Sequence, residues 1–149
     1  MNIVEITQAL YPGEMEAGNV KFYQPETEVL IQSWAIPGVP QPTEAELLAQ
    51  GPGLQWQFDF DNLVLSINSA VGNLLNITAQ AKGYDNAMHC VSYVGDVNLT
   101  WNDEAIVFKT YRSAMWTYVF STISGFTPHG SPLPTLEEIM SGVPAIVWP

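Results

Sequence analysis

The stretch that most constrains the fold is residues 83–120, which predict a short helix, a tight connection and a long helix. Asp85 is placed to cap a helix over residues 86–94, because its carboxylate can accept hydrogen bonds from the free amides of a first turn. Gly95 follows, and glycine readily adopts the left-handed conformation that ends a helix. We therefore expect two closely joined helices in this part of the chain.

The long helix of this stretch is predicted to begin at Thr100, whose hydroxyl can cap it. Asp103 and Glu104 follow in an expected first turn, where the helix dipole favours negative charge. Large or apolar residues then recur at helical spacing, which predicts one face turned towards a core. These residues are Trp101, Ala105, Phe108, Tyr111 or Arg112, Met115, Trp116, Val119 and Phe120.

A combination of aromatic and charged residues in this half of the chain forms a motif. It consists of Gly83, Tyr84, Asp85, Ser92, Tyr93, Trp101, Glu104, Ala105, Tyr111, Arg112 and Trp116, with PTLEE at residues 134–138 and PAIVWP at residues 144–149. The motif resembles a helical domain found in proteins encoded beside bacteriophage tail fibres. Tyr111 departs from it, because that domain has tryptophan before the arginine. The resemblance implies that the fold-defining residues are Tyr84, Asp85, Tyr93, Trp101, Glu104, Arg112 and Trp116.

The charge balance limits the kinds of molecule that the protein is expected to bind. Four basic and fifteen acidic side chains give a net charge of −11, and only 13% of the residues are charged. Nucleic acids and anionic membrane surfaces require clustered Lys and Arg, so this balance argues against both and permits a basic protein partner. The length of 149 residues predicts one core or two small interdependent modules.

No secretory signal or membrane-spanning segment is expected. Residues 1–16 lack a basic region and a long apolar run. No stretch reaches the roughly 18 apolar residues that span a bilayer. Cys90 is the only cysteine, so an internal disulfide cannot form. We interpret it as a small buried residue, with a reactive thiol as the alternative, and we expect the protein to fold in a cytoplasm.

The N-terminal third predicts a small mixed module. Residues 2–10 suit a short amphipathic helix, with a β interpretation of residues 2–6 as the alternative. Residues 20–23 and 28–36 predict two strands, joined as a hairpin through residues 24–27. A two-stranded hairpin is only marginally stable alone, so it is expected to pack on a helix or to pair with another chain.

A proline-rich connector at residues 37–42 leads to a helix start. Thr43 and Glu46 form a capping box, in which each side chain can accept a hydrogen bond from the other residue's backbone amide. The sequences LYPG at residues 10–13 and PQPTEAEL at residues 40–47 resemble a small protein encoded next to the tail fibre in PBSX-like defective prophages. This second resemblance points to the same genetic neighbourhood as the first.

The middle of the chain is interpreted as a boundary followed by new elements. The GPG sequence at residues 51–53 is expected to end the helix and separate two domains. Residues 54–60 alternate apolar and polar side chains, which predicts a strand, with helical packing as the alternative. A long helix is expected from Asp61 to residues 82–83, and Gly72 would let a neighbouring helix or another chain approach closely. Its apolar positions are Val64, Ile67, Val71, Leu74, Ile77 and Thr78 or Ala81.

The C-terminal end predicts one more helix and a docked tail. Residues 135–140 begin with a second capping box, formed by Thr135 and Glu138. The tail at residues 143–149 is too apolar to be left in solvent. The side chains expected to dock onto the helices are Ile146, Val147 and Trp148.

No constellation of residues indicates catalysis or metal binding. His89, His129 and Cys90 are the only nitrogen or sulfur donors of the metal-binding kind, and adjacent positions 89 and 90 lie on different sides of a helix. The acidic cluster at residues 59–62 lacks the glycine and distal glutamate of a calcium-binding EF-hand loop. No nucleophile elbow, phosphate loop or dinucleotide fingerprint occurs. We therefore predict a non-enzymatic protein with no catalytic or metal-ligating residues, no cofactor and no small-molecule substrate.

Arg112 has two interpretations. It is the only arginine, and Phe108 and Trp116 lie one turn away on the same expected helix. It could recognise a partner, because Trp, Tyr and Arg concentrate binding energy at interfaces. We favour a structural role, in which Arg112 stacks on Trp116 and pairs with Asp85 or Glu104. The aromatic residues assigned to the core with it are Tyr93, Trp101 and Trp116.

The candidate partner-binding residues are therefore placed elsewhere. Tyr23 and Trp34 belong to the expected hairpin, whose unpaired edges suit strand addition. Trp56 and Phe58 belong to the aromatic segment that follows the boundary, and exposed aromatic clusters indicate protein partners. The alternative is that these side chains seal the hairpin onto the helices.

Together these patterns predict an α+β fold. Residues 1–50 are expected to form a small module of helix, two-stranded hairpin and helix, and residues 54–149 a helical domain of three to four helices. The resemblances imply a bacteriophage tail protein that binds the tail fibre or its baseplate attachment region, as a structural adaptor or a fibre assembly chaperone.

The expected partners are the tail fibre protein and a baseplate protein, and the expected locations are the host cytoplasm during assembly and the virion tail. The alternative is an acidic phage protein that binds and inhibits a host protein. An enzyme or lysis-related factor is the least favoured class, because no catalytic constellation occurs.

Overall fold

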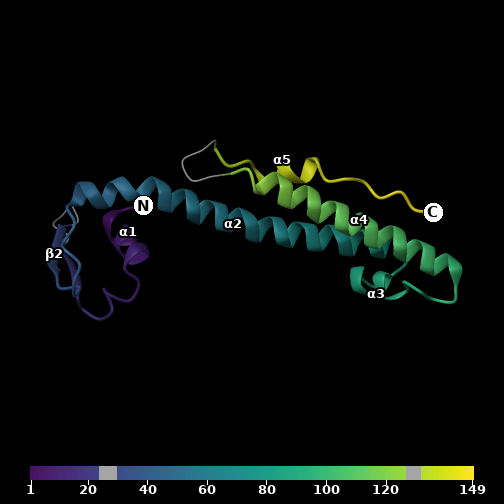
Figure 1. The fold of residues 1–149 in the computed structure, drawn as a ribbon, viewed down its shortest axis with the longest axis horizontal. Coiled ribbons are helices and arrows are strands. Elements are labelled where there is room, and N and C mark those ends of the chain that lie inside the picture. The colour runs from purple at the N-terminus through teal and green to yellow at the C-terminus, as the bar shows by residue number, and fades with distance from the viewer. Residues whose placement is uncertain (24–29, 127–131) are drawn as a thin grey trace. The chain divides into compact units, whose positions relative to one another are not determined.

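The computed structural model describes residues 1–23, 30–126 and 132–149 (Figure 1). The chain divides into two compact units, Met1–Asp59 and Phe60–Pro149, which we call unit 1 and unit 2. The described residues form five helices and one two-stranded antiparallel sheet. The predicted α+β class, with a hairpin in the N-terminal part and helices in the C-terminal part, is confirmed.

Unit 1 begins with helix α1, Ile3–Leu10, so the helical interpretation of this segment holds and the β alternative does not. The Asn2 side chain accepts hydrogen bonds from the amides of Val4 and Glu5, and the Glu5 carboxylate accepts one from the Asn2 amide. This reciprocal capping fixes the start of the helix. The side chains buried on its inner face are Ile3, Ile6 and Thr7.

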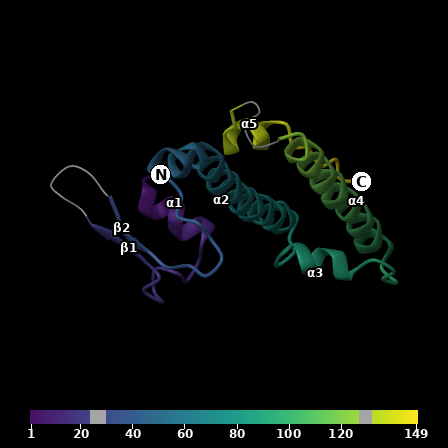
Figure 2. The ribbon, with the colours of Figure 1, turned by 60° about the vertical axis from the view of Figure 1, so that its left-hand side comes forward.

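The hairpin consists of β1, Val20–Tyr23, and β2, Leu30–Trp34, which run side by side (Figure 2). They pair antiparallel, with Val20 opposite Trp34. The second strand is shorter than the expected residues 28–36, and the expected link at residues 24–27 lies outside the described residues. Phe22 and Ile31 pack against the buried residues of α1. Packing on a helix thus supplies the support that a lone hairpin lacks.

Helix α2 spans Glu44–Ala81 and passes straight through the sequence expected to break it. The Thr43 and Glu46 capping box at its start is confirmed, with the Thr43 amide 2.7 Å from the Glu46 Oε2 atom. The end expected before residue 51 is wrong, and residues 54–60 take the helical alternative instead of forming a strand. The proposed division into domains at residues 1–50 and 54–149 stays a prediction.

Packing against α1 explains why α2 continues through the GPG sequence. A proline inside a helix costs about 3 kcal/mol. Leu47 is buried against Ile3 and Ile6, and Leu54 packs on the same cluster. A Cβ atom added at Gly51 would lie 3.0 Å from the Cδ1 atom of Ile6, so glycine lets α2 approach α1 closely. These contacts offset the free-energy cost of placing Pro52 inside a helix. They join residues that are far apart in the sequence, so the local sequence does not reveal them.

Unit 2 packs the remainder of α2 with α3, Ala87–Ser92, α4, Leu99–Ile123, and α5, Leu136–Ser141. Within unit 2, the buried residues of α2 recur at every fourth position. They form a narrower face than the one predicted from its apolar residues. The buried residues that α2 and α4 share are Ile67, Val71, Leu75, Ala79, Phe108, Tyr111, Met115 and Val119. Ile77, expected on the inner face, is 61% exposed.

Both helix starts in the stretch at residues 83–120 differ from the prediction. Asn86 caps α3 in place of Asp85, because its extended backbone lets the side-chain oxygen accept from the His89 amide. Asn98 caps α4 in place of Thr100 by the same means. Because α4 therefore begins at Leu99, Asp103 and Glu104 lie beyond its first turn. Gly95 has a φ of 88°, so the predicted left-handed glycine is confirmed.

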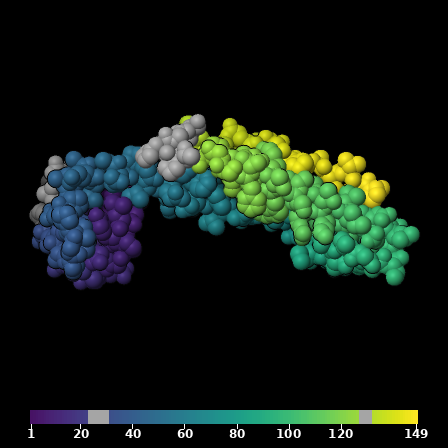
Figure 3. All heavy atoms as spheres, in the orientation of Figure 1, coloured from purple at the N-terminus to yellow at the C-terminus, as the bar shows by residue number. Residues whose placement is uncertain are grey.

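The C-terminal segment after α5 lies along α4 (Figure 3). The Thr135 and Glu138 capping box of α5 is confirmed. Trp148 stacks on Phe108 with ring centroids 5.9 Å apart and an interplanar angle of 13°, and Ile146 packs on the same core. Val147, which was also expected to dock, is 83% exposed, because alternate side chains of the extended segment point outwards.

Replacing Gly72 with alanine is expected to raise the free energy of unfolding by about 0.5 to 1 kcal/mol, because alanine restricts the unfolded chain and favours the helix. The predicted close approach of a neighbouring helix at Gly72 is wrong, since an added Cβ atom meets nothing of this chain within 4 Å, whereas the approach of another chain stays a prediction. Chemical denaturation measures the change. Gly51→Ala is the control, because its Cβ atom meets Ile6, and an equal gain there would contradict this explanation.

Candidate functional site

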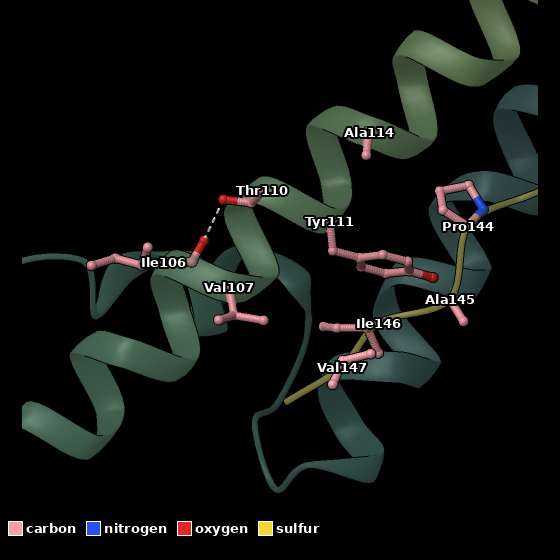
Figure 4. Close-up of a pocket in the computed structure, with 9 residues that line it drawn as sticks. All are labelled: Ile106, Val107, Thr110, Tyr111, Ala114, Pro144, Ala145, Ile146 and Val147. Atoms are coloured by element: carbon pink, nitrogen blue, oxygen red, sulfur yellow. Dashed lines mark hydrogen bonds between the residues drawn. The ribbon is translucent and has the colours of Figure 1, made fainter. Parts of the chain in front are cut away.

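Unit 2 contains an apolar groove between α4 and the C-terminal segment (Figure 4). Its volume is about 340 Å³. Two parts of the chain far apart in sequence form its walls. The α4 wall consists of Ile106, Val107, Thr110, Tyr111 and Ala114, and the opposite wall of Pro144, Ala145, Ile146 and Val147. We call this site the tail groove.

The lining of the tail groove suits apolar side chains. The two hydroxyl groups among its residues belong to Thr110 and Tyr111, and Thr110 Oγ1 donates to the Ile106 carbonyl oxygen at 3.0 Å. Ile106 is 46% exposed and Val147 83% exposed, so apolar side chains reach solvent on both walls. No lining residue carries a charge. Such a groove can bind an apolar segment of another protein.

A buried carboxylate joins the end of α2 to α4. Glu104 is 9% exposed and lies on the inner side of α4. The Tyr84 hydroxyl donates to Glu104 Oε2 at 2.7 Å, and Lys82 Nζ lies 3.0 Å from Glu104 Oε1. Lys82 Nζ also lies 5.4 Å from the centre of the Trp148 ring. One acidic side chain thereby connects three segments of unit 2.

The surroundings of Glu104 shift its own pKa, and its charge contributes to the shifted pKa of a nearby thiol. Burial raises the pKa of Glu104, but hydrogen bonds from Tyr84 and Lys82 and the charge of Lys82 outweigh it, so the pKa is lowered overall. Burial, with the nearby Glu104 charge, raises the pKa of the Cys90 thiol to about 11. Cys90 is fully buried, as predicted. A protonated, enclosed thiol is a poor nucleophile, so the alternative of a reactive cysteine is not supported.

Several motif residues meet beside Tyr84, which binds this carboxylate. Tyr93 lies between Tyr84 and Trp101, with ring centroids 5.6 Å and 5.3 Å away. His89 Nε2 is 3.1 Å from the Tyr93 hydroxyl, and His89 Nδ1 is 3.1 Å from the Asp85 carboxylate. The expected core position of Trp101 is wrong, since 47% of it is exposed. These contacts hold α3 against the start of α4.

Arg112 and Trp116 lie apart from this cluster. Among the described residues, no carboxylate lies within 4 Å of the Arg112 guanidinium, so the expected pairing with Asp85 or Glu104 is wrong. Lys82 holds the position opposite Glu104 instead. Trp116 is half-buried and stacks on Phe120 with ring centroids 5.7 Å apart. Arg112 is thus available for another contact, although it does not line the tail groove.

The four predicted partner-binding residues lie in unit 1 and have different roles. The side chain of Tyr23 lies outside the described part of the structure. Trp34 Nε1 donates to the Val39 carbonyl oxygen at 3.0 Å, and its ring meets Tyr11 edge-on at 5.1 Å, which indicates a structural role. Trp56 is half-buried, whereas Phe58 is 59% exposed on α2. Of the four, Phe58 is the one whose exposure fits a contact surface.

Within residues 1–23, 30–126 and 132–149, no three His, Cys, Asp or Glu side chains converge in a way that could hold a metal ion. Over the same ranges, no helix combines the length and the apolar content needed to cross a bilayer.

Comparison with protein-family models, curated proteins and solved structures gave no match. The tail groove was missed in the sequence because its walls are about thirty residues apart, with α5 between them. The apolar tail at residues 143–149 was the one signal that could have located it.

Proposed function

We propose that this protein is a non-enzymatic bacteriophage tail component that binds the tail fibre, or the baseplate region where the fibre attaches. It acts as a structural adaptor or as a fibre assembly chaperone. The tail groove is the observation that supports this proposal most. The PAIVWP sequence, which carries part of the resemblance to tail-fibre-associated proteins, forms one wall of an exposed apolar groove. Exposed apolar surface of this kind is used for contacts with other proteins.

The proposed mechanism follows from an apolar groove on a protein of strongly negative net charge. An unassembled fibre exposes apolar surface that would otherwise aggregate, and an apolar groove can cover such a segment. The net charge of −11 keeps the carrier itself soluble through mutual repulsion. If the protein leaves the fibre when the fibre trimer is complete, it acts as a chaperone. If it stays bound, it acts as an adaptor between fibre and baseplate.

Val147→Asp is expected to weaken binding to the fibre protein at least about tenfold, because a charge would be buried against apolar surface. Val147 is 83% exposed in the free protein, so the fold should be retained. Co-expression with the fibre protein and quantitative co-purification measure the effect. Val97→Asp is the matched control, because Val97 is 98% exposed and does not line the tail groove. Equal binding by the two variants would contradict the assigned surface.

Mass spectrometry of purified infectious particles separates the two forms of the proposal. A fixed ratio to the fibre protein identifies an adaptor in the virion. Absence from particles, with co-purification with newly made fibres, identifies a chaperone. Absence from both would overturn the tail function.

The distribution of charge favours one second candidate, an acidic phage protein that binds and inhibits a host protein. Residues 1–59 contain eight of the fifteen acidic residues and one of the four basic residues, a net charge of −7. A host partner would then be basic, and its binding would weaken steeply with salt. Binding to the fibre protein through the tail groove would instead depend weakly on salt.

A further inference from the structure

Unit 1 carries a second apolar surface, formed by the first turns of α2 and by Met1. Two adjoining hollows of about 350 and 250 Å³ lie along it and share Met1 and Gln55. Leu48 and Pro52 line the first hollow, and Phe58 lines the second. These α2 residues are spaced by three or four positions, which places them on one side of the helix. We call this surface the acidic face, because of the charges described below.

The apolar side chains of the acidic face are open to solvent. Leu48 is 45% exposed, Phe58 59% and Met1 40%. Single exposed apolar residues are ordinary, but a continuous set of them around hollows is typical of an interaction site. The surface is about 15 Å long from Leu48 to Phe58 at the helical rise, which is the length of a short peptide segment.

One carboxylate lines this apolar surface, and two more lie close to it on α2. Glu5 lines the second hollow, and Asp59 follows Phe58 on α2, where it accepts from Gln55 Nε2 at 2.9 Å. Glu44 lies one turn before Leu48 on α2. No Lys, Arg or His lines either hollow, and the sole basic residue of residues 1–59 is Lys21 on β1. The net charge of −7 would repel a second copy of this chain and attract a basic segment.

Pro52 removes one backbone hydrogen-bond donor from the same surface. Proline has no amide hydrogen, so the Leu48 carbonyl lacks the donor that position 52 supplies in an ordinary helix. Both residues are exposed on the acidic face. A Lys or Arg side chain, or an amide of a bound segment, is the donor that would satisfy this oxygen.

We propose that the acidic face docks a protein segment in which apolar side chains alternate with Lys or Arg. The apolar side chains enter the hollows beside Leu48 and Phe58, and the basic groups meet Glu5, Glu44 and Asp59. This surface lies in unit 1 and its occupant is chosen by charge, so it does not depend on the function proposed for the tail groove.

A synthetic peptide provides a defined probe. A fluorescein-labelled 14-residue peptide of Leu and Lys in amphipathic order is titrated with the full-length protein, and binding is followed by fluorescence anisotropy. Peptides with Glu in place of Lys, and with Ser in place of Leu, test the two required chemistries. We expect the Leu–Lys peptide to bind at least about tenfold more tightly than either control, and its affinity to fall with rising salt.

Two matched variants locate the binding surface. Leu48→Ser is expected to weaken binding of the Leu–Lys peptide at least about fivefold. Leu65→Ser, at a 65% exposed leucine on the same helix, is expected to change it less than about twofold. Phe58→Ser is the second variant for the second hollow. Far-UV circular dichroism confirms that each variant retains its helices.

Three results would overturn the proposal. The first is no preference for the Leu–Lys peptide over the Glu-containing peptide. The second is an equal loss of binding in Leu48→Ser and Leu65→Ser, which would indicate attraction to the charge of the whole chain. The third is a dimer in sedimentation velocity that Leu48→Ser converts to a monomer, which would identify a second copy as the occupant. Failure of the tail groove to bind fibre protein would affect none of these results.

Discussion

Replacing Phe108 with alanine is expected to lower the free energy of unfolding by about 3 to 5 kcal/mol. Phe108 is completely buried in the core of unit 2, where α2 and α4 meet, and it stacks on Trp148 of the C-terminal segment. Truncation would leave a cavity that the surrounding helices cannot fully close, and it would remove the ring on which Trp148 lies. Guanidinium denaturation followed by circular dichroism measures the loss.

Phe120→Ala is the control for this prediction. Phe120 lies on the same helix and is 60% exposed, so its truncation is expected to change the free energy of unfolding by about 0.5 kcal/mol or less. Equal losses for the two variants would contradict the assigned inner face of α4. Because Phe108→Ala also releases Trp148, limited proteolysis within residues 143–149 should be faster in that variant and unchanged in Phe120→Ala.

The difference between Phe108 and Phe120 shows why the inner face of α4 was only partly predictable. Ala105, Phe108, Met115 and Val119 are buried as expected. However, large apolar residues occur all around α4, and Leu99, Ile106 and Phe120 are exposed on its outer side. Periodicity selects one face only when the opposite face is polar. The contacts of α4 with α2 and with the C-terminal segment therefore decide which of its apolar residues are buried.

Reciprocal capping boxes were predicted reliably, whereas the single caps assigned to Asp85 and Thr100 belong to Asn86 and Asn98. The capping boxes of Thr43 with Glu46 and of Thr135 with Glu138 form as expected, because each depends on atoms three residues apart. Signals that tertiary contacts can overrule were predicted poorly. The GPG sequence reads as a break, yet Gly51 is the residue that lets α2 approach Ile6 of α1.

The candidate sites also combine residues that a local motif identifies with residues that only packing brings together. The carboxylate Glu104 was identified from the motif, but its basic partner was not, because Lys82 reaches it from the end of α2 while Arg112 lies two turns along α4. Phe58 was predicted as a contact residue, and the acidic face contains it. Met1 and Leu48, which complete that face, carry no individual signal, since only the packing of α1 on α2 brings them together.

Replacing Glu104 with alanine is expected to lower the free energy of unfolding at neutral pH by about 2 to 3 kcal/mol. The substitution leaves the Tyr84 hydroxyl without its acceptor at 2.7 Å and Lys82 without its counter-charge at 3.0 Å. Tyr84 is 8% exposed, so water replaces the lost acceptor poorly. Lys82 is 30% exposed, which limits the cost of its unpaired charge. Glu137→Ala on α5 is the control, because Glu137 is an exposed glutamate.

A cycle with Tyr84→Phe separates the hydrogen bond from the loss of packing. If the Tyr84 to Glu104 contact carries the effect, the double variant should be more stable than the sum of the two single losses predicts, by about 1 kcal/mol or more. Additive losses would show that the hydrogen bond contributes little and that Lys82 or the side-chain volume accounts for the change.

The pH dependence of stability tests the same contact without a change in shape. The pKa of Glu104 is lowered in the folded protein, so the unfolded chain binds the proton more tightly. The contribution of Glu104 is therefore fully present above its unfolded pKa of 4.5 and is lost as the pH falls through the lower folded value. Glu104→Gln keeps the size of the side chain but cannot ionise, so its stability should fall less steeply below pH 4.5 than that of the unmodified protein. Parallel curves in this range would show that Lys82 and Tyr84 do not favour the charged carboxylate, and the connection between α2 and α4 would then rest on apolar packing alone.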